Sequence, residues 1–258
     1  DGEGYYAYLP SYLLYHDDSF RILLSQHLSP AATHFPVGVF GFSLQPTGHY
    51  LDKYPVGEAM LVLPFFLAGH VLAIIAGQVA DGYSAIEEGA AGLAGLFYTV
   101  LGLLALGAVL RRWFSDGVAA ATLAAVTFGT AVFHYATYDS IFSHAFAFFA
   151  CAAMLLCAVR WYESPESKRR ALLLGLAAGL VVAVRLTDAV LLLAIPLLGA
   201  GTSAAVRERL LLFRRQWSGI AIAAVAGAVM LLPQVVTWYL ATRHLVVRAY
   251  QGEDFNFA

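Results

Sequence analysis

The run GLAGLFYTVLGLLALGAVL occupies residues 92–110 and contains no charged residue. A stretch of about 20 apolar residues is the length that one α-helix needs to cross a bilayer. Apolar runs recur along the chain, and we place them at 56–77, 92–110, 117–136, 141–161, 171–184, 187–200 and 218–240. They predict an all-α fold, a polytopic bundle of transmembrane helices.

The overall composition leads to the same class. The 258 residues are 60% hydrophobic and 12% charged, with a mean hydropathy of +0.71, whereas soluble domains have about 25% charged residues. We therefore expect one membrane domain over 1–258, with an outer loop carrying juxtamembrane helices (1–55), apolar helices (56–240) and an outer tail (241–258). Nothing in the chain suggests nucleic-acid binding.

The first 55 residues are too interrupted by prolines and polar residues to span a membrane. They predict two short surface helices, around Tyr8–Tyr15 and Ser19–Leu28. The chain begins at Asp1 without a methionine and ends in a polar tail from Gln251, so we expect it to be truncated at both ends, with at least one preceding helix missing.

Basic residues predict the orientation. Ten of the fifteen fall in three loops: Arg111, Arg112; Arg160, Lys168, Arg169, Arg170; and Arg207, Arg209, Arg214, Arg215. Loops rich in arginine and lysine stay cytoplasmic, which predicts a multi-pass protein of the cell inner (plasma) membrane. The turns at 137–141 and 185–188, the loop 78–91 and the tail after 240 are then extracytoplasmic.

This orientation conflicts with a complete crossing by 56–77, because the polar stretch His49–Gly57 would then be cytoplasmic. Glu58 at the start of this segment and Pro64 within it favour a broken helix. If 56–77 is re-entrant or lies along the membrane surface, His49–Gly57 shares the outer face with the N-terminal carboxylates and Asp139.

Two polar stretches contain the first candidate site. Asp1 and Glu3 are flanked by glycines, which allow close backbone approach, and by Tyr5 and Tyr6, which can stack or hydrogen-bond. This pattern suits a hydroxyl-rich ligand with a carboxylate as general base, and a solvated loop is the alternative.

The second stretch is Asp52-Lys53-Tyr54-Pro55, at the entry to an apolar helix. A lysine ammonium held there suits a phosphate group. An interfacial Lys/Tyr anchor is the structural alternative.

Asp139 and His144 form a second candidate, at the boundary between two apolar segments, with His134 five residues before Asp139. Ionisable residues at such a boundary are functional candidates. No third ligand lies at a convincing spacing, so we predict neither a metal nor another cofactor.

Arg185 and Asp188 join segments 171–184 and 187–200, which form either a tight hairpin or one long charged helix. The pair is in ion-pair range if helical, and Arg185 is equally suited to a lipid phosphate. Gly175 and Gly179 suggest close helix contact nearby.

Together, four stretches resemble the multi-pass GT-C glycosyltransferases, nearest the bacterial protein O-mannosyltransferase and lipid A aminoarabinose transferase group. They are the Asp-Gly-Glu-Gly-Tyr-Tyr start, Lys53-Tyr54-Pro55-Val56-Gly57, Tyr138-Asp139-Ser140 with Ser143-His144, and 175–180 leading to Val184-Arg185-Leu186-Thr187-Asp188. Such enzymes move a sugar from a polyprenyl-phosphate donor to a lipid, glycan or protein acceptor at the extracytoplasmic face of the membrane.

The resemblance implies Asp1 as the base, with Glu3 as the alternative, Asp139 as a second acidic position, and Lys53 and Arg185 as phosphate contacts. The chain departs from the family where Asp1-Gly2-Glu3 replaces two consecutive acidic residues and where Lys53-Tyr54-Pro55 replaces His-Pro-Pro or Lys-Pro-Pro.

Two other classes compete with the transferase. A transporter or flippase would use Asp139, His144, Arg185 and Asp188 as an ionisable path through the bilayer, but would carry such residues near the midplane of paired broken helices. A non-catalytic assembly subunit would tolerate loss of the outer carboxylates.

Overall fold

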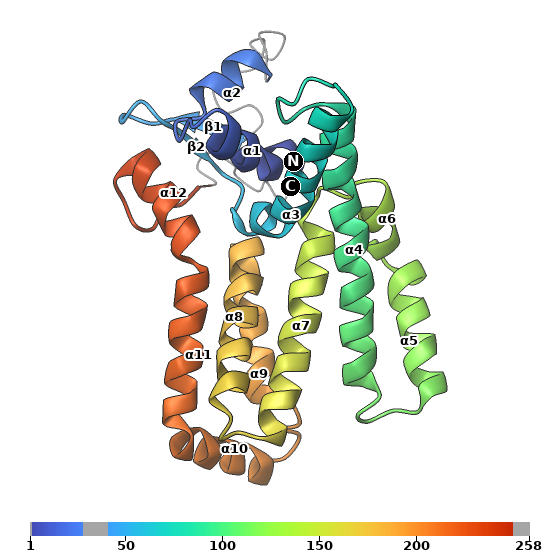
Figure 1. The fold of residues 1–258 in the computed structure, drawn as a ribbon. Helices are drawn as coiled ribbons and strands as arrows, with labels where there is room; N and C mark the ends of the chain where they lie inside the picture. The colour runs from blue at the N-terminus through green and yellow to red at the C-terminus, as the bar shows by residue number, and fades with distance from the viewer. Residues whose placement is uncertain (1, 28–40, 250–258) are drawn as a thin grey trace, which may run out of the picture. The chain divides into compact units, whose positions relative to one another are not determined.

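The computed structural model describes residues 2–27 and 41–249, and these are mostly helical (Figure 1). The chain divides into two compact units, the first made of 1–91 with 233–258 and the second of 92–232. The prediction of a single membrane domain stays a prediction, and each unit is described separately below.

The first unit contains short N-terminal helices, a β-hairpin and two longer helices. Its elements are α1 (Gly2–Leu9), a π-helical turn (Pro10–Leu14), α2 (Arg21–Gln26), β1 (Phe42–Leu44), β2 (Tyr50–Asp52), α3 (Gly57–Ile75), the start of α4 (Ala85–Leu110) and nearly all of α12 (Leu232–Thr242). β1 and β2 pair antiparallel with Ser43 opposite Leu51.

The second unit is a helical bundle. It contains the remainder of α4, then α5 (Asp116–Gly129), α6 (Val132–Thr137), α7 (Ser143–Glu163), α8 (Lys168–Val184), a 3-10 helix (Leu186–Leu193), α9 (Ala194–Leu197), α10 (Ser203–Arg215) and α11 (Trp217–Met230). Helix α8 packs between α7 and α11 (Figure 1).

Three helices, α3, α4 and α7, are long and apolar enough to cross a membrane, and α11 with α12 makes a fourth if the bent pair counts as one span. This supports the predicted membrane assignment and the predominantly α fold. The β-hairpin was not predicted. Short helices are present near both predicted positions, but the first begins earlier, at Gly2, and the second is shorter, Arg21–Gln26; their position at the membrane surface stays a prediction.

Two further expectations on the apolar segments were wrong. Segment 56–77 is not broken: α3 is continuous from Gly57 to Ile75 with Pro64 inside it, because one missing backbone donor does not end a helix that packing holds elsewhere. Segment 117–136 is two helices instead of one, separated at Thr130, whose backbone is extended.

The joint between 171–184 and 187–200 is a hairpin. Arg185 has extended backbone angles (φ −145°, ψ 112°), so α8 stops there and the 3-10 helix turns back to pack on it. The chain thus avoids one long helix with charges in its middle.

The predicted small-residue contact is present in the second unit. A Cβ on Gly175 would lie 2.1 Å from the carbonyl oxygen of Ala223, and one on Gly179 would lie 2.6 Å from that of Gly227. Glycine is therefore required where α8 meets α11, because any side chain would collide with backbone.

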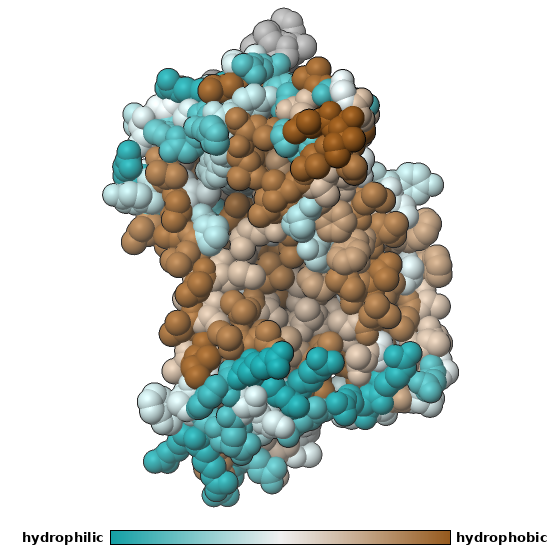
Figure 2. Space-filling model, viewed as in Figure 1, coloured by the Kyte–Doolittle hydropathy of each residue, from teal (hydrophilic) through white to brown (hydrophobic). Residues whose placement is uncertain are grey.

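The three basic loops gather at one end of the second unit. Arg112 pairs with Glu163, Arg170 lies 3.6 Å from the same carboxylate, and the Arg209 guanidinium lies 3.5 Å from the Tyr162 ring centroid. Figure 2 shows hydrophilic side chains collected at this end and apolar ones along the helices. The turns at 138–142 and 185–188 belong to the opposite helix ends.

In the first unit, Glu87 joins the two longest helices. Its carboxylate accepts from the Ser84 hydroxyl at 2.7 Å and the Gly82 N–H at 3.0 Å, and it contacts His70 Nδ1 of α3 at 2.7 Å. Ser84 and Glu87 form a capping box at the start of α4. The buried carboxylate therefore has a full set of partners.

We predict that Gly175→Ala destabilises the protein by about 1–3 kcal/mol, because the new methyl group collides with the backbone of α11. The matched control is Gly89→Ala in α4, where a Cβ meets nothing within 4 Å, so higher helix propensity should stabilise by up to about 1 kcal/mol. Thermal unfolding in detergent micelles should move the two melting temperatures in opposite directions. Equal shifts would contradict the close contact.

Candidate functional site

Tyr54 brings the two predicted N-terminal stretches together in the first unit. A Cβ on Gly4 would lie 2.1 Å from the Tyr54 ring, so α1 runs directly over that ring. The Tyr5 and Tyr54 rings are 4.7 Å apart, and the Tyr8 hydroxyl donates to the Tyr54 carbonyl at 2.7 Å. Helix α1 and the stretch around Tyr54, about fifty residues apart in sequence, therefore pack directly against each other.

The β-hairpin and α12 complete the surroundings of Tyr54. Gly41, with φ +86°, also lies against the ring, and its carbonyl accepts from the Lys53 N–H at 2.8 Å. From α12, the buried Gln234 accepts from the Val56 N–H at 2.8 Å. The backbone on either side of Pro55 is thus fixed by specific hydrogen bonds.

Glu3 lies in the first turn of α1 and remains accessible to solvent. Protein packed around it raises the pKa of its carboxyl group above the usual 4.5, and the nearby Glu88 carboxylate adds to this rise. A higher pKa makes a carboxylate a better proton acceptor near neutral pH. Asp1, the other predicted base, lies outside the described residues.

The predicted aromatic contacts are largely covered by protein. Tyr6 is 4% exposed, and its hydroxyl donates to the Gly82 carbonyl at 2.5 Å. Its ring meets Phe66 edge-on, with centroids 5.7 Å apart. Tyr5 and Tyr54 are buried as well. The three tyrosines therefore belong to the packed core of the first unit, and Glu3 and Lys53 are close to them in sequence.

Asp52 is buried next to this site, at 3% exposure. Its Oδ1 accepts from the Tyr54 N–H at 2.9 Å, whereas its Oδ2 has no hydrogen-bond partner among residues 2–27 and 41–249. Burial raises the pKa of Asp52 well above its usual 3.8, against smaller opposing effects from that hydrogen bond and from Lys53. Its ionised form is therefore costly in the folded protein.

A polar hollow of about 380 Å³ lies beside the hairpin and is lined by Lys53 and Arg248, together with Ser43 and Gln45. Two cationic side chains at one hollow suit an anionic ligand. Arg248 was not singled out in the sequence, because an arginine next to Leu245-Val246-Val247 forms no recognisable motif.

The second unit holds the other predicted residues at the helix ends opposite its basic loops. The Asp139 carboxylate meets His134 Nε2 at 2.6 Å. Backbone at Ser140 packs on α4, where a Cβ on Gly95 would lie 2.1 Å from the Ser140 carbonyl oxygen. Glycine on α4 therefore positions the turn that carries Asp139.

Arg185 is held by partners on both sides. It donates to His144 Nδ1 at 3.0 Å, and its Nε lies 3.9 Å from Asp188 Oδ1, which confirms the predicted pairing. Because arginine only donates hydrogen bonds, Nδ1 of His144 is the acceptor and the proton of neutral His144 lies on Nε2. The Tyr135 ring stacks on His144 with centroids 4.0 Å apart.

Glu58 was noted in the sequence only as a helix start, yet it is 0% exposed and neither of its carboxylate oxygens has a hydrogen-bond partner among the described residues. It lies in the first turn of α3, where the helix dipole favours a negative charge. Nothing in the sequence distinguishes this glutamate from an exposed one.

No protein-family model, curated protein or solved structure matches this chain. Among residues 2–27 and 41–249, no three histidine, cysteine, aspartate or glutamate side chains are placed to hold a metal ion together. What the chain does is therefore inferred from its own residues.

We predict that the folded protein loses less stability as the pH rises from 4 to 8 when Asp52 is replaced by asparagine (Asp52→Asn). An acid whose pKa is raised by folding binds more protons when folded, so wild-type stability falls as pH rises above 3.8 toward the raised value. Asparagine keeps the Oδ1 acceptor and removes the charge.

The control is Asp81→Asn. Asp81 accepts from the Tyr83 N–H at 3.0 Å in the same two-residue arrangement but is only partly buried. Across this pH range the melting temperature of Asp52→Asn should change less than that of the wild type. The melting temperature of Asp81→Asn should change as that of the wild type does. Parallel curves for all three proteins would contradict the burial argument.

Proposed function

We propose that the protein transfers a sugar from a polyprenyl-phosphate donor to a membrane-associated acceptor, in the manner of GT-C glycosyltransferases, at the extracytoplasmic face. The observation that carries this proposal is the direct packing of α1, with Glu3, on the Lys53-Tyr54-Pro55 stretch. The two stretches supply a carboxylate, Glu3, and a cation, Lys53, the two kinds of group that sugar transfer from a lipid phosphate needs.

In this mechanism a carboxylate of α1, Glu3 or Asp1, takes the proton from the attacking acceptor hydroxyl. The oxygen forms a bond to the anomeric carbon while the bond to the lipid phosphate breaks. Lys53 stabilises the negative charge that develops on the leaving phosphate, and Arg248 at the same hollow adds a second positive charge. Arg185 and Asp139 are the corresponding candidates in the second unit.

Two features favour an enzyme over a transporter. In the second unit, Asp139, Arg185 and Asp188 lie at helix ends, whereas a transporter would carry such groups near the bilayer midplane. Arg185 is also held in place by His144 and Asp188, as expected for a residue that must present its guanidinium in one orientation.

The main test is transfer of radiolabelled sugar from polyprenyl-phosphate donors to membrane acceptors by the full-length protein. Loss of a general base lowers the rate by about 10²- to 10⁴-fold, and we expect this from Glu3→Gln or Asp1→Asn. Asp139→Asn tests the second acidic position. Asp116→Asn is its control, because Asp116 pairs with Arg111 at the opposite end of the same unit, and it should leave transfer unchanged.

Normal transfer by Glu3→Gln, Asp1→Asn and Asp139→Asn alike, or no transfer by the wild type from any donor, would overturn the catalytic proposal.

A pH profile separates the candidate bases. The Glu88 carboxylate helps to raise the pKa of Glu3, so Glu88→Gln should lower that pKa. If Glu3 is the base, activity rises as Glu3 loses its proton, and the acidic limb of the kcat/KM profile should move to lower pH in this variant. An unmoved limb would exclude Glu3 and leave Asp1 or Asp139.

A further inference from the structure

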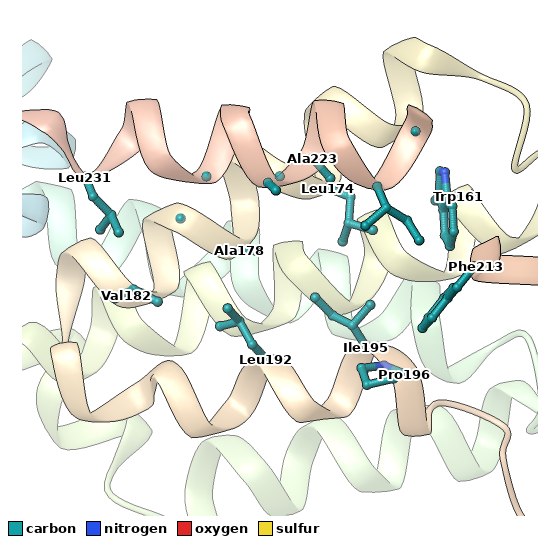
Figure 3. A pocket seen from close by; sticks show the side chains of 16 residues that line it. Trp161, Leu174, Ala178, Val182, Leu192, Ile195, Pro196, Phe213, Ala223 and Leu231 are labelled. Carbon is teal, nitrogen blue, oxygen red and sulfur yellow. The ribbon is translucent and has the colours of Figure 1, made fainter. Parts of the chain in front are cut away.

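A second hollow lies in the second unit and runs from its basic end along α11. It has a volume of about 400 Å³ and is lined by α8, α11 and the 3-10 helix with α9, together with Trp161 of α7 and Phe213 of α10 (Figure 3). Its lining side chains are apolar except for the indole N–H of Trp161. We refer to it below as the apolar cavity.

The apolar cavity extends along α11 from Gly219 to Leu231. Twelve residues of α-helix correspond to about 18 Å, close to the roughly 15 Å depth of one bilayer leaflet. In Figure 3 Trp161 and Phe213 line one end of the cavity, and Val182 and Leu231 line the other. The length of the cavity therefore suits one acyl chain.

The lining of the apolar cavity, which is almost wholly hydrocarbon, suits an acyl chain. Gly175 of α8 and Ala223 of α11 are already in contact at the cavity lining, so another helix cannot enter between α8 and α11.

Trp161 supplies the one polar group. The residue is 2% exposed, and its Nε1 has no hydrogen-bond partner in the described part of the chain. This nitrogen lies 3.8 Å from the position that a Cβ on Gly219 would take, at the cavity lining. A buried N–H without an acceptor is costly, so an acceptor brought by a ligand would stabilise it.

Positive charge borders the same end. Arg214 and Arg215 follow Phe213 directly and are exposed, and neither forms an ion pair within the described chain. Lys168 of α8 bonds the Ser218 hydroxyl, next to Gly219. Helix α10 also exposes Leu210 and Leu211 beside its arginines, the pattern of a helix lying in the membrane interface.

We propose that this is a binding site for an anionic glycerophospholipid. One acyl chain occupies the apolar cavity, its ester carbonyl accepts from Trp161 Nε1, and its phosphate lies against Arg214 and Arg215. A polyprenyl phosphate shares the chain and the phosphate but has no ester carbonyl for Trp161. The site does not depend on the proposed sugar transfer, since binding requires neither donor nor acceptor.

The test is native mass spectrometry of the full-length protein released from nanodiscs of phosphatidylglycerol or phosphatidylcholine. The wild type should retain one phosphatidylglycerol and much less phosphatidylcholine. Ala224→Leu fills the cavity and should abolish retention. Ala221→Leu is the matched control, because Ala221 is also exposed on α11 but lines a different hollow.

Two further variants separate the contacts. Trp161→Phe keeps the ring and removes the N–H, so affinity for phosphatidylglycerol should fall about threefold to tenfold. Arg214→Gln with Arg215→Gln should remove the preference for phosphatidylglycerol while a lipid is still retained.

Equal retention by wild type and Ala224→Leu, or no retained lipid in the wild type, would overturn the proposal. A dimer that Ala224→Leu dissociates would assign the cavity to a second copy of the chain instead. Displacement of phosphatidylglycerol by farnesyl phosphate at equal concentration would assign it to the sugar donor. These outcomes leave the transfer assay unaffected, so failure of one proposal does not count against the other.

Discussion

A backbone N–H or C=O group in hydrocarbon has no water to bond and must find its partner within the protein. Every long apolar run in this chain therefore becomes a helix, because a helix satisfies its own backbone. At Thr130 and Arg185 the backbone becomes extended, and at both positions a new short helix begins within a few residues.

The cost of burying charge determines where the ionisable residues lie. In the second unit the arginine-rich loops gather at one end, and the turns carrying Asp139 and Arg185 lie at the other helix ends. Within the first unit, Glu87 is tolerated at 0% exposure because His70, Ser84 and Gly82 all contact it. Glu58 has the same burial without those contacts, which makes it the least compensated carboxylate described.

Small residues let separate parts of each unit approach closely enough to act together. Gly4 and Gly41 both lie against Tyr54 in the first unit, and Gly175 allows α8 to touch α11 in the second. The polar site and the apolar cavity depend on these contacts. The polar hollow presents the cationic Lys53 and Arg248, which suit a lipid phosphate. The apolar cavity presents an apolar lining near exposed arginines, which suits a lipid chain.

The sequence by itself determined the membrane class, the positions of most helices and the grouping of basic loops, because hydrophobicity and charge placement act locally and can be read residue by residue. It also indicated Gly175, Arg185 and Asp188 correctly as contact residues. Only the tertiary structure decided that Tyr54 joins α1 to Lys53, that Tyr6 is buried and that α3 runs unbroken through Pro64. These depend on which distant surfaces meet, as with the hairpin at 42–52, and a local pattern contains no information about a partner tens of residues away.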